Sequence, residues 1–199
     1  MAEVFERYEL EGKYVRLEPL SLNHLEGLKK VVAEGDLYQS FVTVIPAPDH
    51  VEQFINDAQA AYEAGDGLAF AIIDLASGEV AGTTRYTHAN NAHGCVEIGY
   101  TFLGHRYQKS PINTNTKALL LKYAFDGLGM IRVQFITDYL NQNSRRALER
   151  MGAKQEGILR NHMIMPDGRI RDSVMFSIIA NEWIGVEQNL IFKLSQSYA

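Results

Sequence analysis

"GCVEIGYTFLGHRYQKSPINTNTKALLLKYAFDGLGMIRVQFITD", residues 94–138, contains the pattern that decides the fold. Its first ten residues alternate as a strand does, with Val96, Ile98, Tyr100 and Phe102 on one face and Cys95, Glu97, Gly99 and Thr101 on the other. A helical stripe follows a loop, made of Leu121, Ala124, Phe125 and Leu128, before a second strand over 132–138. A helix between two strands predicts a right-handed crossover and parallel pairing of those strands.

The segments on either side of this unit complete a mixed sheet. Strands are predicted over 13–20, 67–75, 78–88 and on both sides of "MPDGR" (165–169), and helices over about 21–33, 51–62 and 141–152. Hairpin turns are expected at 76–78 and at Asp167–Gly168. The predicted order is β α α β β β α β α β β. The fold class is α/β or α+β, with about seven strands and about four helices.

Composition limits the class of protein. The chain has 199 residues, of which 46% are hydrophobic and 22% charged, which is typical of a globular protein, and we expect one domain over 1–199. Cys95 is the single cysteine, which favours a reducing cytoplasm. No secretory signal and no apolar stretch of about 20 residues is present. The net charge of −5 argues against nucleic acid and anionic membranes as partners and would suit a cationic amine substrate.

Six segments, taken in order, resemble one enzyme family: "YVRLEPL", "AGTTRY", "EIGYTFLGHRYQ", "INTNTKALLLKYAF", "VQFITDYLNQNSRRALERMGAKQEGILRNHM" and "DGRIRDSVMFSIIANEW". The chain resembles the GNAT superfamily of acyl-CoA-dependent N-acetyltransferases, and most of all its RimJ/RimL-type branch, which acetylates ribosomal-protein N-termini. The resemblance runs from about Val15 to Trp183. It implies the GNAT fold, acetyl-CoA as acetyl donor, and direct attack by an amine acceptor in a ternary complex. The acceptor is a protein N-terminus or a small-molecule amine.

The loop before the central helix departs from the family. Relatives read Gln/Arg-x-x-Gly-x-Gly/Ala there, and their amides bind the CoA pyrophosphate; aligning Arg106 with the first position places Lys109 and Pro111 on the two glycines. Pro111 has no N–H but suits a first helical position, and Lys109 could supply an ammonium–phosphate pair. The alternative is a helix capped by Ser110 that binds no ligand. The resemblance implies cofactor contacts from these residues: Thr101, Phe102, Leu103, Arg106, Lys109, Ser110, Ile112, Asn113 and Asn141.

Two residues are candidates for proton transfer. Ser144 lies in "NQNS", which matches the family's Asn-x-x-Ser, and it shares a helical stripe with Ala147, Leu148 and Met151, so we expect it to protonate the leaving thiolate. Glu97 is the candidate base for the amine, directly or through water; a solvated outward residue or a structural ion-pair partner is an equal alternative. Backbone amides of Thr101 to Leu103 should polarise the thioester carbonyl, where the family has a bulge.

Other features leave functions open. Arg85 could meet an acidic substrate or pair structurally with a carboxylate such as Glu97, and we favour structural pairing. The six histidines lack ligand spacing, so no metal is predicted. Residues 35–50 are the candidate wall of the acceptor pocket. A non-catalytic acyl-CoA binder and a homodimeric interaction protein, associating through 182–194, are the alternatives to an enzyme.

Overall fold

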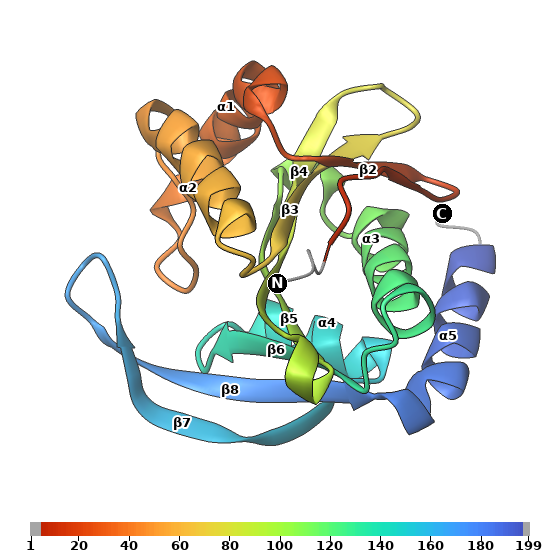
Figure 1. The fold of residues 1–199 in the computed structure, drawn as a ribbon. Coiled ribbons are helices and arrows are strands. Elements are labelled where there is room, and N and C mark those ends of the chain that lie inside the picture. The colour runs from red at the N-terminus through yellow and green to blue at the C-terminus, as the bar shows by residue number, and fades with distance from the viewer. Residues whose placement is uncertain (1–4, 197–199) are drawn as a thin grey trace.

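The computed structural model describes residues 5–196, which form an open sheet of eight strands (Figure 1). The strands are β1 (Leu10–Glu11), β2 (Val15–Pro19), β3 (Leu68–Asp74), β4 (Val80–Asn90), β5 (Cys95–Leu103), β6 (Arg132–Asp138), β7 (Lys154–Ile164) and β8 (Ile170–Ile179). Their order is β1-β2-β3-β4-β5-β6-β8-β7, and β5 and β6 form the parallel pair. In Figure 1, β3 and β4 stand upright, whereas β6 to β8 run across the bottom, so the sheet has two halves that differ in direction.

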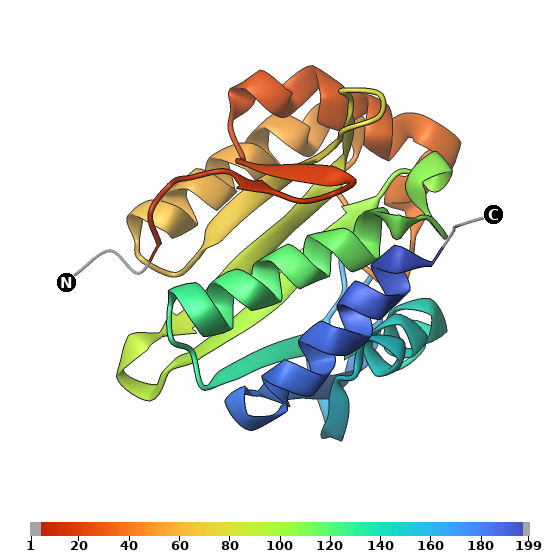
Figure 2. The same cartoon turned by 90° about the vertical axis from the view of Figure 1, so that its right-hand side faces the viewer.

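Helices cover both faces of the sheet. They are α1 (Leu25–Ala33), α2 (Val51–Glu63), α3 (Pro111–Lys122), α4 (Gln142–Met151) and α5 (Ala180–Ser195). α1 and α2 pack on one face of β3 and β5, where Leu28 and Ile55 are fully buried in a cluster with Phe102. α3 and α5 lie side by side on the other face, where Leu120 and Leu190 belong to the larger core cluster (Figure 2). Among residues 5–196, no helix is both long and apolar enough to cross a membrane.

The predicted order of elements is confirmed, and the structure adds two more. β1 is a strand of two residues that pairs with β2. α5 begins directly after β8 and occupies the segment that we had considered only as a dimerisation tail. Its buried residues Trp183, Val186 and Leu190 recur at helical spacing, so the tail covers the sheet of its own chain.

Both predicted hairpins are present, and the turn chemistry explains them. The β3–β4 turn is held by Asp74, whose carboxylate accepts bonds from the Ser77 amide and hydroxyl. In the β7–β8 turn, Gly168 has φ +83°, a conformation that favours glycine, and Asp167 Oδ1 accepts from the Arg169 amide at 3.0 Å. The crossover from β5 through α3 to β6 and the parallel pairing are confirmed as well.

The alternation predicted for β5 is wrong beyond Gly99 because the strand carries a bulge. Arg85 of β4 pairs with Gly99 and Thr83 pairs with Phe102, so β5 has one more residue than β4 in this interval. Tyr100 adopts φ +50° at the bulge. Phe102 therefore packs on the α1–α2 face, whereas Val96 and Ile98 pack on the α3 face.

Candidate functional site

The parallel strands β5 and β6 separate after a short contact. Their register covers three residue pairs, from Cys95–Arg132 to Glu97–Gln134. Beyond Glu97, β5 continues alongside β4 and β6 continues alongside β8. The residues of β5 from Ile98 onward thus lose their β6 neighbour, and the bulge increases the divergence. The segment expected to polarise a carbonyl, Thr101 to Leu103, lies along this unpaired edge.

Glu97 lies where the strands separate and is surrounded by polar side chains. It is only 7% exposed, and its Oε2 accepts from Gln134 Nε2 at 3.2 Å. The ring Nδ1 of His88 lies 3.6 Å from the same oxygen. Burial raises the pKa of Glu97, and Gln134, His88, His162 and Arg171 oppose that rise. A carboxyl with a raised pKa next to an open strand edge suits proton transfer.

The start of α3 is capped as the sequence indicates. Ser110 is the N-cap; its Oγ accepts from the Ile112 amide at 3.3 Å and donates to the Tyr107 carbonyl. Pro111 takes the first helical position. Lys109 has φ +56°, the left-handed conformation that glycine adopts most readily, so it occupies a backbone position suited to glycine. Its exposed side chain stands just before the positive end of the helix dipole.

The other loop residues have separate surroundings. Ile112 is buried in the core, whereas the half-buried Asn113 belongs to the first turn, whose amides lack partners within the helix. Arg106 is directed elsewhere: its Nη2 lies 2.7 Å from Glu79 Oε2 and its Nε lies 3.7 Å from Glu34 Oε2. The structure does not bring Arg106 to the start of α3, because two carboxylates hold it on the α1 side.

α4 begins just after β6 with a second capped turn. Asn141 is its N-cap, and its Oδ1 accepts from the Ser144 amide at 3.0 Å. Ser144 is half-buried in the first turn. Because β5 and β6 are parallel, the helix that follows each begins at the same edge of the sheet. The starts of α3 and α4 therefore lie at the edge to which Thr101–Leu103 leads.

Lys117 is a polar residue of this region that sequence reasoning missed. It is 7% exposed, and its Nζ donates to Thr101 Oγ1 at 2.7 Å and lies 3.5 Å from Thr84 Oγ1. Burial lowers the pKa of Lys117 to about 7. A signal existed, because Lys117 precedes Leu120 and Leu121 by three and four residues and so shares their buried stripe.

Gln134 and His88, which lie beside Glu97, were not predicted as site residues. Gln134 is the parallel partner of Glu97, but its identity depends on the register between two strands that are 37 residues apart. His88 follows an irregularity in β4 and has φ +51°, which no pattern in the sequence indicates.

The segment 35–50, our candidate acceptor wall, contacts the β7–β8 hairpin. Arg169 Nη2 donates to the Phe41 carbonyl at 2.7 Å and to Asp138 Oδ2 at 2.6 Å. Asp138 ends β6 and is 1% exposed. This segment and the hairpin thus border the face of the sheet that carries Glu97.

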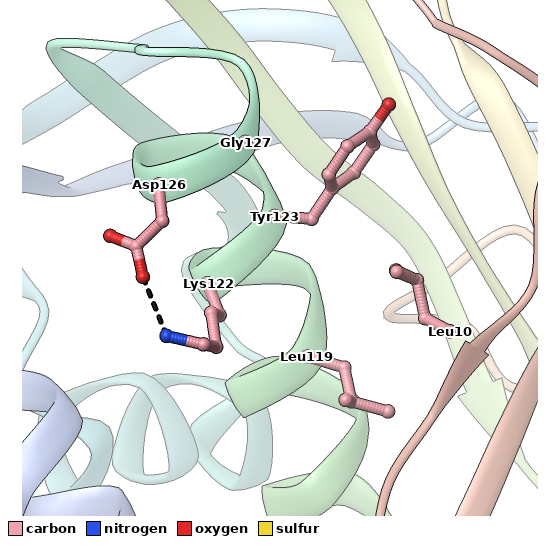
Figure 3. Close-up of a pocket in the computed structure, with 6 residues that line it drawn as sticks. All are labelled: Leu10, Leu119, Lys122, Tyr123, Asp126 and Gly127. Carbon is pink, nitrogen blue, oxygen red and sulfur yellow. Dashed lines mark hydrogen bonds and ion pairs between the residues drawn. The ribbon is translucent and has the colours of Figure 1, made fainter.

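A hollow of about 300 Å³ lies elsewhere, at the far end of α3 (Figure 3). Leu10, Leu119 and Tyr123 line it together with the Lys122–Asp126 ion pair. It is separated from the start of α3 by most of the helix, so we do not assign it to the site. Within residues 5–196, no group of three or more His, Cys, Asp or Glu side chains is arranged to hold a metal ion.

Known proteins are similar to this chain in sequence and in fold. The family model described as acetyltransferase (GNAT) domain matches residues 15–154. The chain is 30% identical over 145 residues to the uncharacterized N-acetyltransferase p20 of Bacillus licheniformis, covering 73% of this chain and 78% of that protein. A GCN5-related N-acetyltransferase structure from Brucella melitensis is 36% identical, with TM-score 0.84 over 96% of this chain and 86% of that one.

A more distant structure shares the fold. RimJ from Mycobacterium smegmatis, in complex with CoA-disulfide, is 20% identical, with TM-score 0.78 over 90% of this chain and 88% of that one. The expected GNAT architecture is confirmed, as is the expectation of an acyltransferase. The match over residues 15–154 and the separation of β5 from β6 lead to one conclusion: this chain belongs to the GNAT family of acetyltransferases.

Proposed function

We propose that this protein transfers an acetyl group from acetyl-CoA to a primary amine by direct attack in a ternary complex. The observation that carries the proposal is the separation of β5 from β6 beside the buried Glu97, with the starts of α3 and α4 at the same edge. Bound acetyl-CoA would supply a thioester. RimJ from Mycobacterium smegmatis, which has the same fold, is in complex with CoA-disulfide, and this supports a CoA donor here.

The residues at the edge fit such a donor. Asn113 keeps a first-turn amide without a partner in the helix, because Pro111 has no N–H and the Ile112 amide bonds to Ser110. Lys109 adds a positive charge. The unpaired edge at Thr101–Leu103 offers backbone amides, and Asn141 positions the turn that carries Ser144. Arg106 does not contact the donor directly in this proposal, since its guanidinium forms ion pairs with Glu79 and Glu34.

In this proposal, two side chains move the protons while the acetyl group passes from sulfur to nitrogen. Glu97 accepts the proton that the attacking amine loses, directly or through water. A C–N bond forms as the C–S bond breaks, and Ser144 provides a proton to the leaving thiolate. Cys95 is not required, because its thiol lies at the opposite end of β5 and bonds to the His93 carbonyl at 3.1 Å.

The acceptor in this proposal is a protein N-terminus, as in the RimJ/RimL-type branch, or a small-molecule amine. An α-amine with a pKa of about 7.7–8.0 is partly neutral at pH 7, whereas a lysine amine is not. We further propose that residues 1–199 act as a single domain in the cytoplasm. The alternative is a non-catalytic acyl-CoA binder or a homodimeric interaction protein, and the latter would associate through the exposed side chains of Ile184, Ile191 and Phe192 on α5.

Titration calorimetry tests the donor site. We expect micromolar binding of acetyl-CoA and CoA, and Lys109→Glu should weaken it more at low salt than at high salt, because the reversed charge faces a phosphate. Lys30→Glu, an exposed lysine on α1, is the control. Absence of binding at millimolar ligand would reject the proposed function. Equal affinity in both variants would move the phosphate site away from this loop.

A further inference from the structure

Arg85 is a buried cation on the face of the sheet that carries Glu97. It lies in the middle of β4, is 7% exposed, and pairs with Gly99 of β5. Its guanidinium lies against two aromatic rings that contact each other, with Cζ 4.4 Å from the centroid of Tyr100 and 5.2 Å from that of Phe54 on α2. The bulge that gives Tyr100 its φ of +50° places that ring over the guanidinium.

The expected structural pairing of Arg85 with Glu97 is wrong. Among residues 5–196, the guanidinium makes no hydrogen bond or ion pair, and its Nε is buried without a partner. Arg171, which is 8% exposed, differs: its Nε donates to Ser173 Oγ at 2.9 Å and lies 4.0 Å from Asp138. A buried charge normally has a partner, because an unpaired one costs several kcal/mol.

The carboxylates nearest to Arg85 are already engaged. Asp66 accepts from the Thr87 hydroxyl and from the His88 amide, and Asp57 accepts from Gln53. Burial lowers the pKa of Arg85, although the charges of Asp57 and Asp66 counteract this effect. A guanidinium nevertheless stays protonated at neutral pH. The fold therefore keeps a positive charge in a partly desolvated place without neutralising it.

A glycine, which has no side chain, lies next to both Arg85 and Glu97 in the sheet. Gly99 lies opposite Arg85 and two residues after Glu97, so the three share one face of the sheet. A Cβ added to Gly99 would lie 3.3 Å from Glu97 Oε1 and 3.9 Å from Thr87 Cγ2. Arg85 and Glu97 are diagonal neighbours across the β4–β5 pair, a relation in which residues are about 7–8 Å apart and long side chains can reach each other.

We propose that Arg85 binds a carboxylate of the acceptor, so that the substrate is an amine that also carries a carboxylate. The amine lies against Glu97 above Gly99, and the carboxylate pairs with the guanidinium that Tyr100 and Phe54 support. Arg85 is thus a specificity-determining residue, and this inference rests on the proposed acetyltransfer. The local positive charge outweighs the hint from the net charge of −5 that the substrate would be purely cationic.

Matched acceptors test the inference through the release of free CoA thiol, with hydrolysis in the absence of acceptor subtracted. One pair is alanine and alaninamide; the other is the peptide amides Asp-Ala-Ala and Asn-Ala-Ala. We expect kcat/KM to be at least about tenfold higher for the carboxylate member of one pair. A preference within the first pair identifies a free amino acid as the substrate, and one within the second identifies an acidic N-terminus.

Arg85→Met separates recognition from structure. We expect kcat/KM to fall about 100-fold for the preferred carboxylate acceptor and to change little for its amide. The melting temperature should stay or rise, because the substitution removes an unpaired buried charge. Arg85→Lys should restore only part of the preference, since an ammonium lacks the planar fork. Arg150→Met, at an exposed position of α4, is the control and should leave kcat/KM unchanged for both acceptors.

The failures are distinguishable. If amines are acetylated with no preference in either pair, or if Arg85→Met slows both members equally, the inference about Arg85 is overturned and the proposed function stands. If no amine is acetylated although the protein is folded, the proposed function fails first. If Arg85→Met does not fold, the preference of the unmodified protein and of Arg85→Lys for the carboxylate acceptor over its amide still tests the inference.

Discussion

Lys117 shows how one side chain sets a dependence of stability on pH. Burial lowers its pKa from 10.5 to about 7, and its Nζ donates to Thr101 of the bulge. Below pH 7 the lysine is protonated in both the folded and the unfolded chain, so the cost of burying the charge is fully present. Between about 7 and 10.5 the unfolded chain binds more protons, so stability rises with pH.

Lys117→Met should abolish that rise. At pH 6 we expect the variant to gain about 2 kcal/mol in free energy of unfolding, since each pKa unit is worth about 1.36 kcal/mol and the lost hydrogen bonds offset part of the gain. Urea unfolding at a series of pH values measures it, with Lys30→Met as the exposed control. An unchanged pH dependence would show that Lys117 titrates normally.

Glu97 should control the acid limb of the rate. Its pKa is raised by burial, so the carboxylate needed to accept a proton forms only above the usual range for glutamate. We expect kcat/KM to rise with pH in that interval, and Glu97→Gln should lower the rate and remove the limb. Gln134→Ala is the companion variant, because losing its bond to Glu97 should move the limb to higher pH. An unaltered profile in Glu97→Gln would make Glu97 structural.

Ser144 is expected to act on turnover rather than on binding. Ser144→Ala should lower kcat roughly 10- to 100-fold and leave the affinity for acetyl-CoA nearly unchanged, because the hydroxyl is assigned to proton transfer. Its amide, which bonds to Asn141, is kept in the variant. Stopped-flow rates and calorimetry separate the two quantities, with Ser195→Ala as control. If turnover is unchanged, Ser144 has no role in the mechanism.

At the scale of an element, the β7–β8 hairpin depends on one backbone conformation. Gly168 has φ +83°, and no atom lies within 4 Å of an added Cβ, so Gly168→Ala isolates conformational strain from packing. We expect a loss of about 1 kcal/mol in stability. Gly157→Ala, in β7, also meets no atom within 4 Å but has no positive φ, and it should be neutral or stabilising. Thermal unfolding compares them; equal effects would contradict the explanation.

Helices and turns could be predicted where a local sequence pattern indicates which residues are buried. The faces of a strand were harder to predict where they depend on its register with a neighbouring strand. In the predicted helical stripe, Leu121 is buried in α3, and Ala124 and Phe125 are buried in the π-helical turn Tyr123–Gly127 that follows it. The turn at Asp167–Gly168 was identified in the sequence and is present as well. Tyr100 and Phe102 were assigned to the same face of β5 as Val96 and Ile98, and the bulge moves both rings to the opposite face, where they contact Phe54. A bulge depends on the register between β4 and β5, and the alternation of residues in β5 alone does not indicate that register.

For the whole molecule, Arg169 connects the two halves across the open face. It donates to the Phe41 carbonyl and to Asp138, which is 1% exposed. Arg169→Met should lower the free energy of unfolding by about 3 kcal/mol, because the buried carboxylate of Asp138 loses its nearer arginine and keeps the Leu140 amide and the more distant Arg171. Amide hydrogen exchange should rise in residues 35–50, and KM for the acceptor should rise with it. Arg160→Met, which breaks an exposed pair with Asp172, is the control. Unchanged exchange would mean that the segment is held by other contacts.

The sequence by itself determined the order of elements, the crossover, the capped start of α3 and the family, because periodicity, turn residues and motifs are local properties of the chain. Only the tertiary structure decided which polar groups meet: His88 and Gln134 with Glu97, Lys117 with Thr101, and Arg106 with Glu79 rather than with the loop. Within residues 5–196, it also left Arg85 against Tyr100 and Phe54 without a hydrogen bond or an ion pair. The physical reason is that such contacts depend on register and on the separation of strands, which long-range packing sets.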